Sequence, residues 1–177
     1  MLKRAECNLR PIALNDLEKV LQWRNSERIR RNMFTDHEIT LDEHKAWFAG
    51  LKQNNNSIYL VFEVINKPVG LVYFTDIDNT NGKSNWGFYL GEENLPDGSG
   101  TAMGILGLEY AFIQLKIRKL CSEVLEFNDA SIRFHGKFGF VKEGRLIQHV
   151  LKNGTYQDVI LFALFQSYWL INRHNLN

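Results

Sequence analysis

The sequence lacks several features that would mark particular classes of protein. It has two cysteines and three prolines in 177 residues, and Cys7 and Cys121 show no CxxC or metal-binding spacing. We therefore expect reduced thiols, no disulfide framework and no bound metal. No apolar run approaches the ~20 residues of a membrane span, and the N-terminus lacks the long apolar core of a signal peptide. These absences predict a soluble, cytoplasmic protein.

A net charge of either sign is also missing. The 21 Lys and Arg residues nearly balance 20 Asp and Glu residues, for a formal net charge of +1. No overall field would then draw the chain to nucleic acid or to a membrane surface, so local groups must hold any anionic ligand. The composition is that of a globular protein, with 45% hydrophobic residues. Without repeats or linkers, the length predicts one domain over residues 1–177.

What the sequence does contain is an ordered series of strand and helix patterns. Strands are predicted at 8–12, 57–65, 69–77, 84–91, 118–127, 141–151 and 156–165. Helices are predicted within 15–33, over 41–52, after Gly100 and over 128–138, with capping boxes at Asn15–Glu18 and Thr40–Glu43. Gly139 suits a helix C-cap and Asn153–Gly154 a hairpin turn. This order predicts an α/β (α+β) fold, with a mixed, mostly antiparallel sheet of about seven strands and helices on both faces.

A glycine-rich stretch, LPDGSG at residues 95–100, stands directly before an apolar helix. Glycine weakens a helix by roughly 1 kcal/mol per interior site, so glycines here indicate that the backbone itself is needed. A helix N-terminus presents unpaired N–H groups that suit phosphate. The stretch is not a Walker loop, because no Lys-Ser/Thr follows it. An ordinary glycine-containing loop is the alternative.

Two segments, separated by a helix and a strand, resemble motifs of the GCN5-related N-acetyltransferase (GNAT) superfamily. Residues 95–100 match its pyrophosphate-loop pattern, Q/R-x-x-G-x-G/A, at Gly98 and Gly100, with Leu95 in place of the polar first residue. The family's later pattern, N-x-x-A/S-x-x-x-Y-x-x-x-G-F, is matched at Asn128, Ser131, Gly139 and Phe140. His135 stands where the family has tyrosine. The resemblance covers nearly the whole chain.

This resemblance implies a single GNAT domain that uses acetyl-CoA as cosubstrate, with backbone N–H groups of the loop holding its pyrophosphate. The cofactor-binding residues that it implies are Phe88, Tyr89, Leu90, Gly98, Ser99, Gly100, Thr101, Ala102, Asn128 and Phe134. By the same resemblance, His135 would serve the departing thiolate, with a packing role as the alternative. Glu126 could take a proton from the incoming ammonium, and an exposed structural glutamate is the alternative there.

The N-terminal half resembles N-acetyltransferases of bacterial nonulosonic acid synthesis, especially those of the pseudaminic acid branch. These acetylate the 4-amino group of a UDP-linked 4-amino-4,6-dideoxy sugar. A diphosphate is bound by the forked guanidinium of arginine, and a uracil ring by aromatic faces. Among the arginines, we expect Arg30 to bind the diphosphate. Met33 or Tyr73 would contact the sugar methyl group. The expected acceptor-binding residues are Trp23, Arg24, Asn25, Arg30, Met33, His44, Trp47 and Tyr73.

Two other functions stay open. The Trp-Arg-Asn tripeptide also occurs in relatives that acetylate ribosomal protein N-termini and polyamines, and a protein N-terminus is the second candidate acceptor. A polyamine would favour a dense cluster of carboxylates, which the sequence does not show. A non-catalytic acetyl-CoA-binding module is the third possibility. We expect two small-molecule partners, acetyl-CoA and an amine, with no nucleic acid or membrane partner, and a monomer or homodimer.

Overall fold

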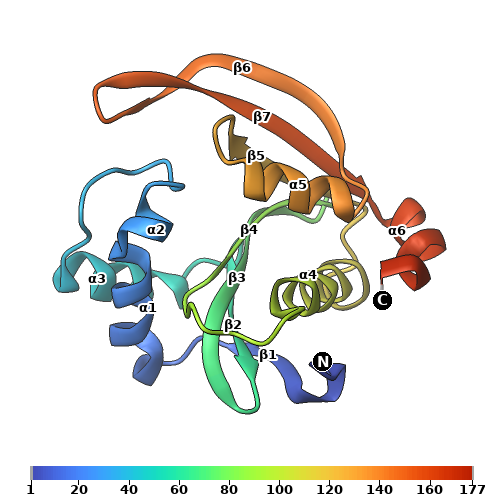
Figure 1. Cartoon of the computed structure of the whole chain (residues 1–177), viewed down its shortest axis with the longest axis horizontal. Helices are drawn as coiled ribbons and strands as arrows, with labels where there is room; N and C mark the ends of the chain where they lie inside the picture. The colour runs from blue at the N-terminus through green and yellow to red at the C-terminus, as the bar shows by residue number, and fades with distance from the viewer. Residues whose placement is uncertain (1, 177) are drawn as a thin grey trace.

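The computed structural model describes residues 2–176 and is organised around a seven-stranded sheet (Figure 1). The strands are β1 (Cys7–Pro11), β2 (Ile58–Val64), β3 (Lys67–Asp78), β4 (Lys83–Leu90), β5 (Lys119–Leu125), β6 (Val141–Lys152) and β7 (Thr155–Phe165). Their order is β1-β2-β3-β4-β5-β7-β6, and only the β4–β5 pair is parallel. The prediction of a mixed, mostly antiparallel sheet of about seven strands is confirmed. Residues 1 and 177 of the predicted domain lie outside the described residues.

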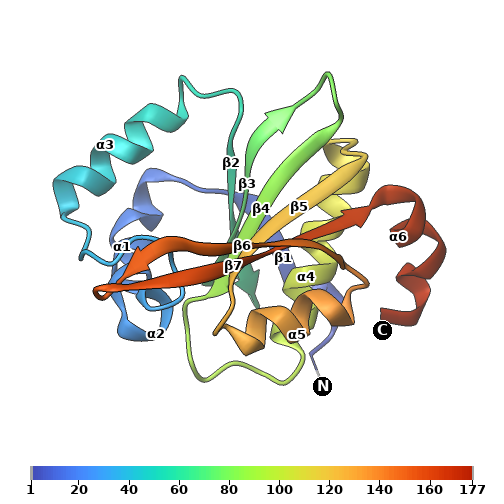
Figure 2. The ribbon, with the colours of Figure 1, turned by 90° about the horizontal axis from the view of Figure 1, so that it is seen from above.

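Helices cover both faces of this sheet, as predicted (Figure 2). They are α1 (Leu17–Asn25), α2 (Glu27–Arg30), α3 (Leu41–Leu51), α4 (Ser99–Glu109), α5 (Asp129–Lys137) and α6 (Gln166–Asn172), with a π-turn at Tyr110–Gln114 after α4. In β2, Leu60 and Phe62 face the larger core, whereas Val61 between them faces a smaller core with Val20 and Trp23 of α1. Because successive strand residues point to opposite faces, one sheet supports both cores. No helix within residues 2–176 is long and apolar enough to cross a membrane.

Several local signals of the sequence determine where elements begin and end. Thr40 Oγ1 accepts a hydrogen bond from Glu43 N–H, and the Glu43 carboxylate accepts one from Thr40 N–H, which confirms the second capping box. Gly139 has φ +82°, and its N–H donates to Gly136 O at the end of α5. Asn153 and Gly154 both have positive φ and connect β6 to β7.

Two local predictions were wrong or incomplete. The Asn15–Glu18 capping box does not form, because a 3₁₀ turn covers Leu14–Asp16 and α1 begins at Leu17. The Asp16 carboxylate instead accepts hydrogen bonds from Arg10 and from Ala13 N–H. Helix α6 was not predicted, since no capping residue precedes it. It is held by tertiary packing, with the buried Trp169 ring 5.3 Å from that of Phe112.

The parallel pair in the middle of the sheet opens towards one end. β4 and β5 are paired only over Lys83–Asn85 and Lys119–Cys121. Beyond this point β4 runs on to Leu90 and β5 to Leu125 without pairing with each other. The unpaired parts of the two strands, residues 86–90 and 122–125, are called the strand opening below. Each carries backbone N–H and C=O groups that an extended ligand can pair with.

Candidate active site

The glycine-rich loop forms an anion-binding helix terminus next to the strand opening. Gly98 is the N-cap of α4 with φ +92°, a left-handed conformation that glycine adopts without strain. The Ser99 and Ala102 N–H groups donate within the loop. Within residues 2–176, the N–H groups of Gly100 and Thr101 have no partner, as is usual for the first turn of a helix. Two free amides and the positive end of the helix dipole suit a diphosphate.

A lysine adds positive charge at the same place. Lys137, the last residue of α5, donates from Nζ to Thr101 Oγ1 over 2.6 Å. Gly100 also lies close to the end of β4, because a Cβ built on it would stand 3.8 Å from Leu90 Cδ1. The loop, the cation and the strand opening are therefore neighbours.

The other expected cofactor residues fall into two groups. The Phe88 and Phe134 rings lie 4.4 Å apart between centroids on the α5 side of the sheet, where Leu90 also packs. Asn128 Oδ1 caps α5 by accepting from Ser131 N–H. Tyr89 points to the opposite face and lines the cavity described next. The sequence prediction grouped Phe88 and Tyr89, which the strand alternation separates.

A cavity of about 620 Å³ lies on this opposite face, between the sheet, helices α1 and α3, and residues 31–40; it is called the main cavity below. One wall is a series of four rings contributed by His44, Trp47, Tyr59 and Tyr73. Successive ring centroids are 4.9, 4.9 and 5.3 Å apart. The cavity therefore offers aromatic faces to an apolar, flat or cationic group.

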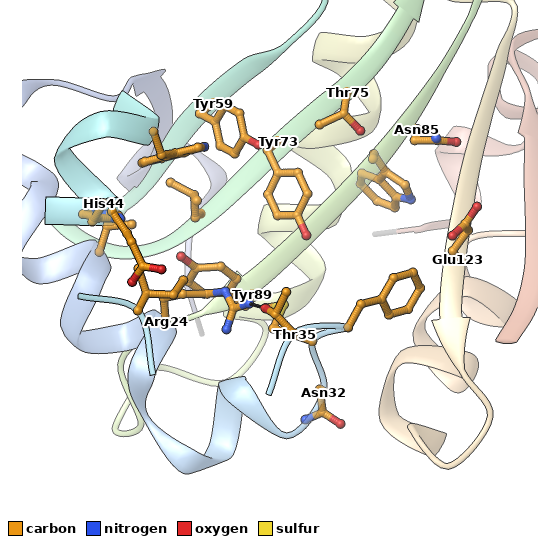
Figure 3. A pocket seen from close by; sticks show the side chains of 18 of the residues that line it. Arg24, Asn32, Thr35, His44, Tyr59, Tyr73, Thr75, Asn85, Tyr89 and Glu123 are labelled. Carbon is orange, nitrogen blue, oxygen red and sulfur yellow. Dashed lines mark hydrogen bonds between the residues drawn. The ribbon is translucent and has the colours of Figure 1, made fainter. Parts of the chain in front are cut away.

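Polar side chains lie towards both ends of the main cavity (Figure 3). Arg24 and Tyr89 lie at one end, and Asn85 and Glu123 at the other, with the Tyr73 ring between them. Arg24 Nη2 donates to Thr35 Oγ1, whereas its Nη1 is buried with no hydrogen-bond partner. At the other end, Asn85 Nδ2 donates to the Asp76 carboxylate over 3.0 Å.

Burial changes the protonation behaviour of the cationic end. Desolvation lowers the pKa of Arg24, but a guanidinium stays charged in proteins. Desolvation raises the pKa of Tyr73 to about 12 and also raises that of Tyr89. Both hydroxyls therefore keep their protons at neutral pH. This end presents one half-buried cation and two O–H donors, an arrangement that binds an oxygen acceptor.

The structure brings five of the eight expected acceptor residues together. The main cavity is lined by Arg24, Met33, His44, Trp47 and Tyr73. His44 is buried and desolvation lowers its pKa, and its Nε2 has no partner. A neutral imidazole with a free ring nitrogen can bind a polar group of a ligand.

Three of the eight do not line the main cavity. Trp23 is buried and donates from Nε1 to Glu92 over 3.0 Å. Asn25 holds the backbone of Ile39, accepting from its N–H and donating to its carbonyl. Arg30 pairs with Glu27. The unpaired guanidinium nitrogen in the cavity belongs to Arg24.

His135 does not fit the predicted role of proton donor. It is 1% exposed, within an aromatic box that includes Trp86, Phe140 and Phe162. Its Nδ1 lies 2.7 Å from Ser131 O, a carbonyl that can only accept, so the ring proton is on Nδ1. Nε2 is then unprotonated, and burial lowers the pKa of His135 to about 4. At neutral pH the ring has no free proton for a thiolate.

This burial predicts an acid-dependent stability. Because the folded pKa is about 4 against an ordinary 6.5, the unfolded chain binds the extra proton, and stability falls as the pH drops from 6.5 to 4. The largest loss from His135 is about 3 kcal/mol. Urea unfolding of the wild type and of His135→Phe at pH 7 and pH 4.5 measures it, and the variant should lose less stability between the two. An equal loss in both proteins would contradict the assignment.

Glu126 lies at the end of its strand, as predicted, but outside the main cavity. It pairs with Arg145 of β6 over 2.8 Å at the end of β5 and is not among the residues that line the main cavity. Glu123, three residues earlier on β5, does line it. The signal in the sequence is the strand alternation, which places Glu123 on the same face as Cys121, the last β5 residue paired with β4. Glu123 therefore stands where the strand opening begins.

Among residues 2–176, no group of three or more His, Cys, Asp or Glu side chains could hold a metal ion. The charged groups of the site are Lys137, beside the free amides of the loop, Arg24, and the carboxylates of Glu43, Asp76 and Glu123. Such a set can bind an anion on one face of the sheet and a polar amine on the other.

Comparison with known proteins gives three findings. A family model described as acetyltransferase (GNAT) domain matches residues 7–141. An uncharacterized N-acetyltransferase of Bacillus subtilis, YokL, is 30% identical over 82% of this chain and 83% of its own. The spermidine N(1)-acetyltransferase of Escherichia coli K12 is 26% identical over 92% of this chain and 87% of its own.

The fold is also that of a solved structure. Spermidine N-acetyltransferase from Vibrio cholerae, in complex with CoA and spermine, superposes with a TM-score of 0.88 over 94% of this chain and 99% of that one. The two sequences are 23% identical, so this likeness shows the fold.

Proposed function

Because this chain belongs to the acetyltransferase (GNAT) family, we propose that it acetylates the amino group of a UDP-linked amino sugar, using the main cavity for the acceptor. That the chain is an acetyl-CoA-dependent N-acetyltransferase follows from the family. The non-catalytic alternative is thereby set aside. What we propose is where acetyl-CoA binds and which acceptor is acetylated.

The loop and the strand opening fit acetyl-CoA. The free N–H groups of Gly100 and Thr101, with Lys137 beside them, would bind the pyrophosphate. The pantetheine arm is extended and amide-bearing, so it would pair with the free edge of β4 between residues 86 and 90. Its thioester would then lie near Glu123, where the opening meets the main cavity.

Glu123 is the proposed base of the reaction. An amine is mostly protonated at neutral pH and attacks only after it loses a proton, which the Glu123 carboxylate would accept directly or through one water. The nitrogen lone pair then forms a bond to the thioester carbonyl carbon. Backbone N–H groups of β4 stabilise the oxyanion. The carbon–sulfur bond breaks, and the thiolate takes the second proton released by the nitrogen.

The observation that carries the acceptor proposal is the unpaired Nη1 of Arg24. A buried guanidinium nitrogen without a hydrogen-bond partner costs free energy unless a ligand supplies an oxygen. An acceptor with its amine near Glu123 and an oxygen-rich or anionic group near Arg24 would match both ends of the cavity. An amino sugar joined to a diphosphate has both groups.

A polyamine is the second candidate acceptor. The E. coli relative and the V. cholerae structure are spermidine acetyltransferases. Three carboxylates, of Glu43, Asp76 and Glu123, line the main cavity, more than the sequence pattern suggested. The aromatic wall could also bind a cationic chain. Arg24 disfavours this acceptor, because a polyamine carries cations and no oxygen to accept a hydrogen bond from Nη1.

Arg24→Gln tests the acceptor proposal. The KM for a UDP-linked 4-amino-4,6-dideoxy sugar should rise about 10- to 100-fold, the loss of one or two charge-assisted hydrogen bonds, while the KM for acetyl-CoA stays unchanged. Thr35→Val is the matched control, because it removes the Arg24–Thr35 bond and leaves the guanidinium. Steady-state thiol release measures both constants. An unchanged KM for the UDP-sugar in Arg24→Gln would contradict the role of this arginine.

A further inference from the structure

One wall of the main cavity has no regular secondary structure. Residues 31–40, called the cavity loop below, connect α2 to α3. The loop contributes six lining side chains, those of Asn32, Met33, Phe34, Thr35, His37 and Ile39. The shape of the cavity therefore depends on what holds this loop in place.

Side chains from two distant parts of the chain hold the loop. On one side, α1 provides the Arg24 bond to Thr35 and the two bonds of Asn25 with Ile39. On the other side, Asp36 of the loop accepts from Lys152 Nζ over 2.5 Å and from Asn153 N–H over 2.7 Å. Lys152 and Asn153 lie at the tip of the β6–β7 hairpin, more than 100 positions away in sequence.

The lysine of this pair is in an unusual environment. Lys152 is 4% exposed, and its Nζ also donates to Arg30 O over 3.3 Å. Lysine is rarely buried unless its charge is paired, because desolvation of the ammonium is costly. Both views show the β6–β7 hairpin extending over α2 (Figures 1 and 2). The Asp36–Lys152 pair therefore joins the tip of the hairpin to the cavity loop.

The hairpin contacts the cavity loop but does not itself line the main cavity. No residue of β6 or β7 is among those that line the cavity. The turn at Asn153–Gly154 and the ladder pairs Leu151–Tyr156 and Lys152–Thr155 form the hairpin by themselves. The Asp36–Lys152 pair therefore holds the cavity loop in position, and the hairpin has its own pairing apart from it.

We infer that Lys152 is a positioning residue for acceptor binding, which acts through Asp36 to hold the cavity loop against the acceptor. This rests on the proposed function only in taking the main cavity as the acceptor site. Without the pair, the loop samples open arrangements and must be ordered again each time the acceptor binds. Removal of the pair should therefore raise the KM for the acceptor. The KM for acetyl-CoA should not change, because acetyl-CoA binds on the other face of the sheet.

Lys152→Met and Asp36→Asn test this inference. Lys152→Met keeps the apolar stem and removes the charge. Because the loop must then be ordered when the acceptor binds, each variant should raise the acceptor KM about tenfold, with kcat and the acetyl-CoA KM little changed. Lys119→Met is the control, because it removes the Lys119–Glu143 pair between β5 and β6 without touching the loop. Lys152→Arg, which keeps the charge, should restore much of the acceptor KM.

Hydrogen exchange supplies a measurement that needs no acceptor. Amides of residues 32–39 should exchange faster in Lys152→Met than in wild type, and those of β7 should not. The KM is measured with the UDP-linked 4-amino sugar, or with spermidine if that proves to be the acceptor, so failure of the proposed function is seen separately. Unchanged loop exchange, an unchanged acceptor KM, or equal losses in kcat and both KM values would each overturn the inference.

Discussion

Gly100→Asp is expected to raise the KM for acetyl-CoA about 100-fold, equivalent to about 2.7 kcal/mol of lost binding. Gly100 N–H is one of two free amides at the start of α4. A side chain there would keep the backbone away from the pyrophosphate, and a carboxylate would add charge repulsion at the positive end of the helix. The fold should tolerate the change, because a Cβ at Gly100 meets nothing closer than Leu90 Cδ1 at 3.8 Å.

Gly100→Ala is the matched variant and separates the two causes. It adds the methyl group without the charge, so its effect on acetyl-CoA binding should be clearly smaller than that of aspartate. Calorimetry with acetyl-CoA measures both, and far-UV circular dichroism checks the helix content. A folded Gly100→Asp protein that binds acetyl-CoA as tightly as wild type would refute the loop assignment.

Glu123→Gln is expected to lower kcat about 10²- to 10⁴-fold, the usual contribution of general base catalysis. The amide has nearly the same shape but cannot accept the proton of the ammonium. The KM for acetyl-CoA should hardly change, because Glu123 lines the main cavity on the acceptor side. Single-turnover acetyl transfer, with acetyl-CoA saturating, measures the chemical step directly.

Glu126→Gln is the matched control for Glu123. It makes the same chemical change three residues along β5, at a side chain that is paired with Arg145 and does not line the cavity. We expect its kcat to stay within a few-fold of wild type. If Glu126→Gln were the inactive variant and Glu123→Gln the active one, the assignment of the base would be reversed.

Much of the fold could be predicted from the sequence, because its signals are local. The Thr40–Glu43 capping box, the C-cap at Gly139 and the turn at Asn153–Gly154 each specify their own backbone, and all three are confirmed. Helix α6 has no such signal, because the packing of Trp169 against residues far along the chain fixes it. The Asn15–Glu18 box does not form, because a 3₁₀ turn covers Leu14–Asp16 and α1 begins only at Leu17.

The site could be predicted only in part, because motifs give positions along the chain and not directions in space. Trp23 and Arg24 are adjacent, yet one is buried in the smaller core and the other lines the main cavity. Arg30 and Arg24 are equivalent in the sequence pattern, and only the structure shows which guanidinium has an unpaired nitrogen. The register that placed His135 at a catalytic tyrosine carried no information on its burial.

We propose that the acceptor is an amine joined to a nucleotide diphosphate. The most direct test of this acceptor is thiol release from acetyl-CoA with four acceptors at equal concentration. These are the UDP-linked 4-amino-4,6-dideoxy sugar, the same sugar without UDP, spermidine, and a short peptide with an N-terminal serine or alanine. Remote binding energy of the nucleotide should give the UDP conjugate the highest kcat/KM, about 100-fold above the free sugar. Equal rates with and without UDP, or faster acetylation of spermidine or the peptide, would contradict the claim.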